Sequence, residues 1–400
     1  MIITRMEIIP IVRSVKGGIG QGRISRAPAQ VHPAILIKLH TDEGIVGYGE
    51  LGGGSATIAA LQEQFAPILL GEDPFNIDKI VHRIENELIY GYVTNITYSF
   101  IQSAVEVALY DIVGKKLNVP VYNLLGGAHA KKFPMSWPIH FGSAEENAKE
   151  AALAYSFGFK CFKVKVGMES WPPGSKDEER LKKIRETIGY DAVLTLDANE
   201  RWSPSEAIKI LNKRLAKYEI AYVEQPVPQW DIDGMARVRK ESEILVAACE
   251  SAVTIRDVVE IIKKEAADII HLKIARSGGF YRSKQIIGMA EAAGLSWTLS
   301  SMAGGVIECA VNTHFAASTM RIPEPPFAYE IGGSVSMNLF RELFEGKTDV
   351  KVEDVAEPIP KIENGYIYVP EGPGLGVEVS EDKIKRFMRE GKQPIIIEKK

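Results

Sequence analysis

Cysteine is scarce in this sequence. Only three cysteines occur among the 400 residues, Cys161, Cys249 and Cys309, and no CxxC pair is present. An odd and widely spaced set is typical of free thiols in a reducing compartment. It argues against a disulfide framework, a zinc ribbon or a thioredoxin-like site.

A strong net charge and long apolar runs are also missing. The formal net charge is -4, which gives no indication of binding to nucleic acid or to an anionic membrane surface. No apolar run approaches the roughly 20 residues of a membrane span, and no apolar signal core follows a basic start at the N-terminus. The composition is otherwise ordinary for a globular protein, so we expect a soluble cytoplasmic protein.

The length and the changing pattern along the chain predict two domains. A chain of 400 residues exceeds what one compact core usually holds. Residues 1–53 are typical of antiparallel β structure, with strands over 2–12, 34–39 and 45–49 and a hairpin turn at 41–44. Apolar residues then recur about 3.6 residues apart, which predicts helices over 56–70, 77–88 and 98–117.

A glycine-rich segment lies between the first two predicted strands. Residues 16–26 hold four glycines and three cations, among them Arg23 and Arg26. The segment lacks a Walker-type motif and lacks a GxGxxG motif that opens a helix. We interpret it as a loop that covers an anionic ligand, with a phosphate-binding loop as the alternative.

From residue 133 onward, strand patterns alternate with helix patterns. Ser143 with Glu146 forms a capping box, and Ser203-Pro204 with Glu206 begins a second helix. Eight such strands over about 200 residues predict a parallel (β/α) barrel, with a doubly wound open sheet as the alternative. The predicted strands cover residues 133–140, 161–166, 192–197, 221–224, 244–250, 268–273, 295–300 and 327–331.

The last part of the chain is too short for a third core. It contains a short strand pattern at 365–369 and a charged tail, and we expect it to pack back on the first domain. The predicted organisation is an N-terminal α+β domain over 1–130, a barrel over 131–331 and a C-terminal segment over 332–400.

Charged and polar residues follow the predicted barrel strands at their ends. The intervals from Lys165 through Asp197, Glu224 and Glu250 to Lys273 are 32, 27, 26 and 23 residues, one βα unit each. A barrel carries its active site at the C-terminal ends of its strands. The alternative is that these residues form structural ion pairs, but that interpretation does not explain why all the charged residues lie at the same end of the strands. The residues at these ends are Lys163, Lys165, Asp197, Glu224, Glu250, Lys273, Ser300, Ser301 and Glu330.

These residue types suggest proton abstraction from carbon. Three carboxylates from neighbouring strands form a hard oxygen site that suits Mg²⁺, with Mn²⁺ next. A metal cation near a lysine lowers the pKa of that lysine, and a partly neutral lysine can take a proton from carbon. The metal would stabilise the enediolate that forms.

Taken together, the motifs resemble the enolase superfamily along nearly the whole chain. A lysine on the sixth strand resembles the muconate lactonizing enzyme-like subgroup, because the mandelate racemase-like subgroup has an aspartate there and a histidine on the seventh strand. Residues 297–301 contain no histidine. The motifs are Lys163-Val-Lys165, Leu196-Asp197-Ala-Asn199, Val223-Glu224-Gln225-Pro226, Glu250-Ser251, Lys273-Ile-Ala-Arg276-Ser-Gly278-Gly279 and Leu124-Leu125-Gly126-Gly127.

The resemblance implies a (β/α)7β TIM-like barrel with an α+β capping domain built from the N-terminal region and the C-terminal segment. It implies a homo-oligomer. It also implies roles for the site residues: Asp197, Glu224 and Glu250 bind the metal, Lys165 and Lys273 face each other across the substrate as acid and base, and Lys163 supports Lys165 and contacts the substrate carboxylate. Asn199, Ser300, Arg23, Arg26 and Glu330 would lie beside these groups or contact substrate. Glu330 either holds a substrate ammonium group or is a structural carboxylate, the reading we favour.

Three features depart from the family pattern. Cys249-Glu250-Ser251 stands where the subgroup often has Asp-Glu-Ser, so Glu250 is the carboxylate left to serve as ligand. Residues 301–305 lack the glutamate that lactonizing enzymes tend to carry near Gly304, which argues against muconate as substrate. The loop after the second strand, at 169–179, looks lengthened, and its Trp171 either reaches the site or belongs to a plain surface loop.

Our first hypothesis is therefore Mg²⁺-dependent removal of the α-proton of a small carboxylate substrate through an enediolate. Racemisation, epimerisation or cycloisomerisation is the expected outcome. A dehydratase acting by β-elimination on a hydroxy acid is the alternative, and a non-catalytic barrel that binds a small acid is the alternative from another class.

Overall fold

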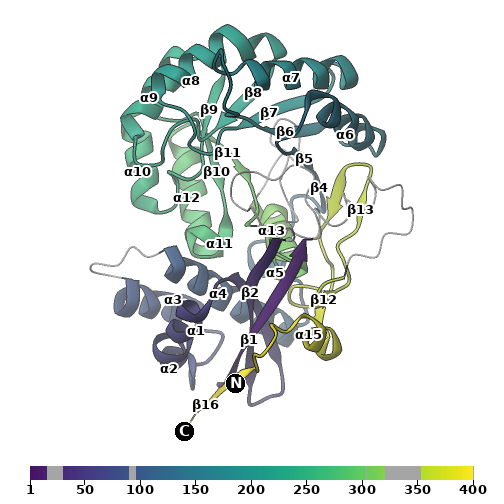
Figure 1. The fold of residues 1–400 in the computed structure, drawn as a ribbon. Helices are drawn as coiled ribbons and strands as arrows, with labels where there is room; N and C mark the ends of the chain where they lie inside the picture. The colour runs from purple at the N-terminus through teal and green to yellow at the C-terminus, as the bar shows by residue number, and fades with distance from the viewer. Residues whose placement is uncertain (16–29, 90–95, 303, 320–352, 400) are drawn as a thin grey trace.

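The computed structural model describes residues 1–15, 30–89, 96–302, 304–319 and 353–399. Figure 1 shows two packed bodies. One is an antiparallel sheet with helices, which lies near both chain termini, and the other is a curled parallel sheet with helices around it. None of the described helices is both long enough and apolar enough to cross a membrane.

The first body is built on a four-stranded sheet in the order β16-β1-β2-β3. The predicted turn at 41–44 joins β2 and β3, with the amide of Gly44 donating to the carbonyl of Thr41 at 3.1 Å. The strands are β1 (Ile3–Val15), β2 (Gln30–Thr41), β3 (Val46–Gly52) and β16 (Ile395–Glu398). The C-terminal strand therefore completes the N-terminal sheet, pairing with β1.

Helices cover one face of this sheet, and α4 packs closely on β3. Two glycines of β3 make the close approach possible. A Cβ atom on Gly49 would lie 2.1 Å from the carbonyl oxygen of Ala104, and one on Gly47 would lie 2.1 Å from that of Ala108. The helical segments are α1 (Ser55–Ala60), η1 (Leu61–Phe65), α2 (Ala66–Leu69), α3 (Ile77–Ile84), η2 (Glu85–Ile89), α4 (Ile96–Leu117) and α5 (Val121–Leu124).

The second body is a parallel sheet of seven described strands in unbroken sequence order, β5 to β11. A doubly wound sheet would reverse its strand order at a switch point, so that alternative is wrong and the predicted barrel class is confirmed. The strands are β5 (Ser136–Ile139), β6 (Cys161–Lys165), β7 (Val193–Asp197), β8 (Ile220–Glu224), β9 (Leu245–Ala248), β10 (Ile269–Leu272) and β11 (Ser296–Leu299). The eighth predicted strand, at 327–331, lies outside the described residues.

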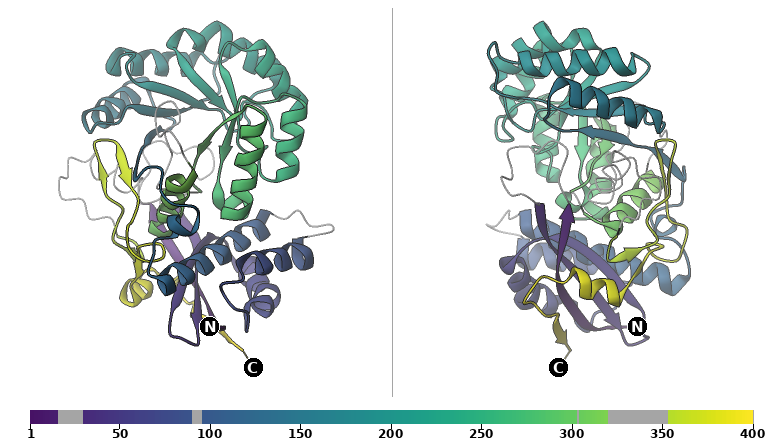
Figure 2. Two further views of the ribbon diagram at one scale, coloured as in Figure 1. Left: turned by 180° about the vertical axis from the view of Figure 1, so that it is seen from behind. Right: turned by 45° about the vertical axis from the view of Figure 1, so that its right-hand side comes forward.

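Helices pack around the outside of this sheet, as the two views of Figure 2 show. Both predicted capping boxes are present: Ser143 and Ser203 accept from the backbone amides of Glu146 and Glu206. The helices are α6 (Ala144–Ser156), α7 (Ser175–Ile188), α8 (Pro204–Ile210), η3 (Leu211–Leu215), η4 (Ala216–Tyr218), α9 (Ile232–Glu241), α10 (Ile255–Lys263), α11 (Ile274–Ser277), α12 (Phe280–Ala292) and α13 (Val306–Thr319).

The C-terminal segment contacts both bodies. Strand β14 (Tyr366–Tyr368) pairs with β13 (Ile362–Glu363) and with β4 (Lys132–Pro134), which precedes β5 in the chain. Two further short strands, β12 (Ala356–Glu357) and β15 (Glu378–Val379), pair with each other and precede α15 (Glu381–Phe387). Part of the segment thus packs on the first body, where β16 pairs with β1, and the pairing with β4 is a contact that the sequence did not predict. The boundaries at 130 and 331 stay predictions.

Candidate active site

The charged residues predicted at the strand ends lie on the inward face of the curled sheet. Side chains alternate faces along a strand. Tyr222, Ala247 and Ile269 form a small cluster of their own, whereas their neighbours Val246 and Ile270 belong to the large core beneath the helices. When this alternation is followed to the ends of β8 and β10, Glu224 and Lys273 face inward. By the same alternation, Lys163 and Lys165 on β6 and Asp197 on β7 face inward as well.

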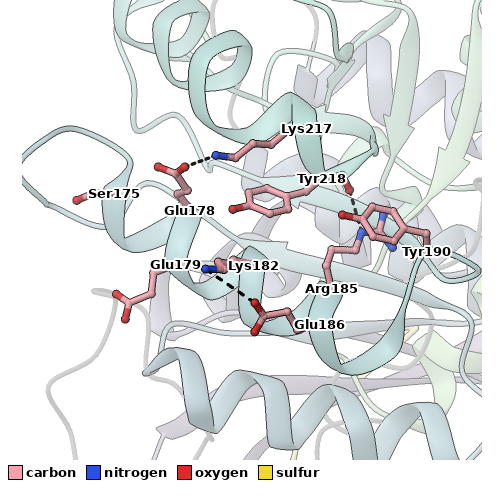
Figure 3. Close-up of a pocket in the computed structure, with 9 residues that line it drawn as sticks. All are labelled: Ser175, Glu178, Glu179, Lys182, Arg185, Glu186, Tyr190, Lys217 and Tyr218. Atoms are coloured by element: carbon pink, nitrogen blue, oxygen red, sulfur yellow. Dashed lines mark hydrogen bonds and ion pairs between the residues drawn. The ribbon is translucent and has the colours of Figure 1, made fainter.

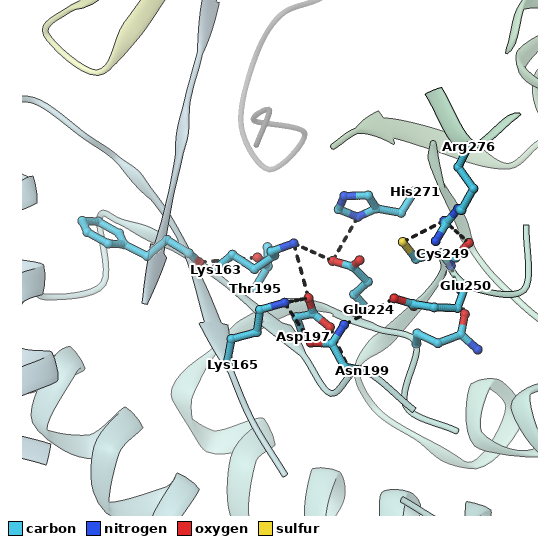
Figure 4. A network of polar contacts seen from close by, with 12 residues as sticks. Lys163, Lys165, Thr195, Asp197, Asn199, Glu224, Cys249, Glu250, His271 and Arg276 are labelled. Atoms are coloured by element: carbon cyan, nitrogen blue, oxygen red, sulfur yellow. Dashed lines mark hydrogen bonds and ion pairs between the residues drawn. The ribbon is translucent and has the colours of Figure 1, made fainter. Parts of the chain in front are cut away.

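Lysines and carboxylates from β6, β7 and β8 form one buried network (Figure 4). The Lys163 ammonium donates to Oε2 of Glu224 at 2.9 Å and lies 3.4 Å from Oδ2 of Asp197. The Lys165 ammonium also contacts Asp197 and donates to Oδ1 of Asn199 at 2.8 Å. Lys163, Asp197 and Glu224 are at most 2% exposed, so these are desolvated charges whose positions are fixed by one another.

Asn199 links this network to the end of β9. Its backbone amide donates to Oδ1 of Asp197 at 3.0 Å, and its side-chain amide donates to Oε1 of Glu250 at 3.3 Å. Its φ of 41° turns the chain sharply just beyond β7. Asn199 is therefore a positioning residue for Lys165 and Glu250.

The carboxylates have different proton affinities. Burial opposes charge on Asp197, but Lys165 and Lys163 outweigh it and hold the pKa of that carboxyl below its usual range. Burial acts against ionisation of Glu250 as well, and the nearby Glu224 adds to this effect, so the pKa of Glu250 is raised. Among the described residues, Oε1 of Glu224 and Oε2 of Glu250 are buried without a hydrogen-bond partner.

Lys273 lies among charged groups just beyond β10. Burial lowers the pKa of Lys273, but the negative charge of nearby groups, Glu224 and Glu250 among them, outweighs it, so the net direction is upward. The lowered pKa predicted from the sequence therefore depends on a bound cation, because the protein's own groups act the other way.

Two residues to which the sequence analysis gave no role in the site also belong to it. His271 is buried, and its Nδ1 lies 3.4 Å from Oε2 of Glu224. Cys249 is buried with its Sγ 3.2 Å from Nη2 of Arg276. The signal was available: His271 stands two residues before Lys273, and Cys249 two residues after the inward-facing Ala247.

Gln225 holds the turn that carries Cys249 and Glu250. Its Oε1 accepts from the backbone amides of Cys249 and Ser251, both at 3.1 Å, and its Nε2 donates to Oγ of Ser251 at 2.7 Å. The side chain is fully buried. This glutamine, next to Glu224 in the chain, therefore fixes the end of β9 against the end of β8.

The donor set fits a divalent cation. Glu224, Cys249 and Glu250 each place one potential ligand atom within 4.8 Å of the others. Asp197 is the register partner of Glu224 on the neighbouring strand. The unpartnered buried oxygens of Glu224 and Glu250 are what a cation would satisfy, since buried charged groups are normally paired or bound to metal.

Of the other predicted residues, Ser300 and Trp171 lie in the described part of the chain. Ser300 is buried just beyond β11, and its amide donates to the carbonyl of Leu272 at 2.8 Å. Trp171 is 88% exposed in the segment between β6 and α7. The predicted contacts of Arg23, Arg26 and Glu330 lie outside the described residues.

A carboxylate does reach the turn after β11, although no glutamate stands at residues 301–305. Glu308, on the first turn of α13, accepts from the amide of Met302 at 2.6 Å and also from that of Gly304. Glu50 of β3 accepts from the amide of Gly305 at 2.6 Å. The N-terminal body thus holds the seventh βα turn of the barrel directly.

An outward-facing pocket lies between α7 and η4, away from the strand ends (Figure 3). Two lysines that line it pair with glutamates that also line it, Lys217 with Glu178 and Lys182 with Glu186. Arg185 donates to the carbonyls of Tyr218 at 2.8 Å and Ala192 at 2.6 Å. These contacts give the pocket a structural role.

The fold and the site define a barrel enzyme whose lysines and carboxylates converge at the strand ends. The family described as "Mandelate racemase / muconate lactonizing enzyme, N-terminal domain" matches residues 19–126, and "Enolase C-terminal domain-like" matches residues 145–383. The chain belongs to this family, within the enolase superfamily and its muconate lactonizing enzyme-like subgroup.

Individual relatives agree with this assignment. The chain is 32% identical to N-succinyl-L-Arg/Lys racemase of Bacillus cereus over 89% of its length and 90% of the relative's. It is 32% identical to muconate cycloisomerase 1 of Rhodococcus opacus, covering 95% of this chain and 96% of that one.

Structural neighbours lead to the same family. The crystal structure of a mandelate racemase/muconate lactonizing family protein from Azoarcus sp. EbN1 superposes with a TM-score of 0.85 at 31% identity, covering 99% of this chain and 100% of that one. Homologues are racemases, epimerases and cycloisomerases, with a dehydratase also present. The predicted enzyme class, a metal-dependent isomerase with a lyase as runner-up, agrees with these relatives.

Proposed function

We propose that this protein removes the α-proton of a small carboxylate substrate and returns a proton to the resulting enediolate, as a racemase, epimerase or cycloisomerase. The observation that carries the proposal is that Lys165 and Lys273 both stand at the inward end of the curled sheet, where Lys165 contacts the buried carboxylate of Asp197. Lys165 ends β6 and Lys273 follows β10, four strands further round the curled sheet. Two lysines from different sides can serve both faces of one carbon.

Each residue of the network has a task in this proposal. Either Lys165 or Lys273 takes the α-proton, and the opposite lysine delivers one to the other face. Asn199 orients Lys165 through its 2.8 Å hydrogen bond. Lys163, held against Glu224, adds positive charge beside the substrate carboxylate.

Asp197, Glu224 and Glu250 would hold a divalent cation, which when bound supplies positive charge that stabilises the enediolate. Carboxylate oxygens favour magnesium, with manganese as the alternative. A cytoplasmic location, a homo-oligomeric state and the domain boundaries at 130 and 331 belong to the same proposal.

A screen of several substrate classes tests which reaction the protein catalyses. Proton NMR would follow a pool of N-acyl amino acids, dipeptides, hydroxy acids and muconate in D₂O with the protein and Mg²⁺. The N-succinyl amino-acid racemase among the relatives favours the first class, and an arabinonate dehydratase at 31% identity keeps elimination as the second candidate. Loss of an α-proton signal that requires metal and at least one of the two lysines supports the proposal, and the new signals distinguish epimerisation from elimination.

The matched control is Lys182→Ala, which removes an exposed lysine of α7 instead of a buried one. It should exchange like the wild type. Cation binding without exchange in any substrate class would favour the non-catalytic barrel.

A further inference from the structure

The inward-facing position at the end of β9 is occupied by a thiol. Within β9, Val246 and Ala248 belong to the core under the helices, and Ala247 belongs to the interior cluster. Continuing this alternation places the next inward side chain at Cys249, while Glu250 has the outward parity. Glu224 pairs in register with Ala247, so Cys249 lies just beyond the level of Glu224.

The surroundings of Cys249 are those of a cation site. Its sulfur and one oxygen each of Glu224 and Glu250 lie within 4.8 Å of one another. Glu224 is 0% exposed, and its Oε1 is buried with no hydrogen-bond partner in the described part of the chain. Such an oxygen next to a buried sulfur is better explained as a ligand for a cation than by packing, since an unsatisfied buried carboxylate is costly.

The thiol is also held in place. Gln225 accepts from the amide of Cys249 at 3.1 Å. The Arg276 guanidinium donates to the carbonyl of Cys249 and lies 3.2 Å from its sulfur. The sulfur is therefore fixed at the strand end, as a preorganised ligand must be.

We propose that Cys249 is itself a metal ligand, so that the site holds its cation with mixed oxygen and sulfur donors. This inference rests on the proposed function, because it uses the same cation site. The thiol gives up its proton to solvent as the sulfur binds the metal. Thiolate sulfur favours softer ions and carboxylate oxygen favours hard ones, so this site prefers Zn²⁺, Co²⁺ or Cd²⁺ to Mg²⁺.

Absorption spectroscopy with Co²⁺ tests this ligand directly, without any activity measurement. Chelator-treated protein is titrated with Co²⁺, and a thiolate-to-cobalt charge-transfer band in the near ultraviolet is expected. Cys249→Ser should abolish the band. Cys161→Ser is the matched control, because Cys161 is also a buried thiol but begins β6, at the end of that strand away from Lys165. This variant should keep the band.

Affinities measured by calorimetry give a second readout. Loss of a residue that merely supports a ligand costs about 10–100-fold in metal affinity, so Cys249→Ser should weaken Cd²⁺ binding at least that much. Cys249→Asp, which makes the donors all oxygen, should instead strengthen Mg²⁺ binding. If circular dichroism shows that Cys249→Ser does not fold, two measurements on the wild type test the inference instead: the presence of the charge-transfer band and the ratio of Cd²⁺ to Mg²⁺ affinity.

Two results would overturn the inference, and they differ in whether the proposed function is retained. Co²⁺ binding that needs Glu224 but gives no charge-transfer band would make Cys249 a packed thiol, with the proposed function intact. No binding of Co²⁺ or Mg²⁺ to the wild type would remove the cation site and the proposed function together.

Discussion

Glu106 gives the protein a predictable pH dependence of stability. It lies on α4, fully buried against the segment that follows Lys273, where the amide of Tyr281 donates to its Oε1 at 3.0 Å. Its other oxygen, Oε2, is buried without a hydrogen-bond partner among the described residues. A Cβ atom on Gly279 would lie 1.7 Å from that oxygen, so the carboxyl group is enclosed by backbone.

The size of this effect on the free energy of unfolding follows from the pKa of Glu106. Burial raises the pKa of Glu106 from 4.5 to about 8. The folded state therefore holds a proton that the unfolded chain releases above pH 4.5, so the folded state is destabilised as the pH rises from about 4.5 to about 8. At about 1.4 kcal/mol per pH unit, the full effect is on the order of 5 kcal/mol.

Glu106→Gln removes this titration while keeping the shape of the side chain. We expect the variant and the wild type to have similar free energies of unfolding near pH 5, and the variant to gain progressively toward pH 8. Denaturant unfolding of both proteins at several pH values measures this difference. Glu265→Gln, which changes an 85% exposed side chain, should leave the pH dependence of the wild type unchanged. A difference between Glu106→Gln and wild type that stays flat across this range would refute the reasoning.

Three further outcomes follow from the site and the fold. Lys165→Ala and Lys273→Ala should each slow α-proton exchange in D₂O by about 10²–10⁴-fold for the enantiomer that the missing lysine serves, the usual worth of a general acid or base, and wild-type exchange of both enantiomers in either variant would contradict the acid–base assignment. Glu224→Gln should weaken divalent-cation binding by calorimetry at least about 10–100-fold, and an unchanged affinity would place the cation elsewhere. Gly49→Ala should lower the free energy of unfolding by roughly 1–3 kcal/mol through overpacking against α4, whereas Gly52→Ala, with no atom within 4 Å of the added Cβ, should cost less; equal losses would argue against the close-approach explanation.

The sequence alone determined the barrel and the strand ends at which its charged residues lie. Both depend on local patterns: alternation along a strand, capping boxes such as Ser143 with Glu146, and a spacing of one βα unit between charged residues. Such patterns involve residues that are close together in the sequence, so they can be recognised without knowledge of the tertiary structure.

Only the tertiary structure decided which groups meet. Nothing local to residues 366–368 indicates pairing with β4, and nothing local to Glu50 indicates a hydrogen bond to Gly305. The same holds for the contact of Arg276 with Cys249 and that of His271 with Glu224. These contacts join segments distant in sequence, and they depend on how strands curl and helices pack. The sequence named groups at the strand ends, and the packing of distant segments decided which of them are in contact.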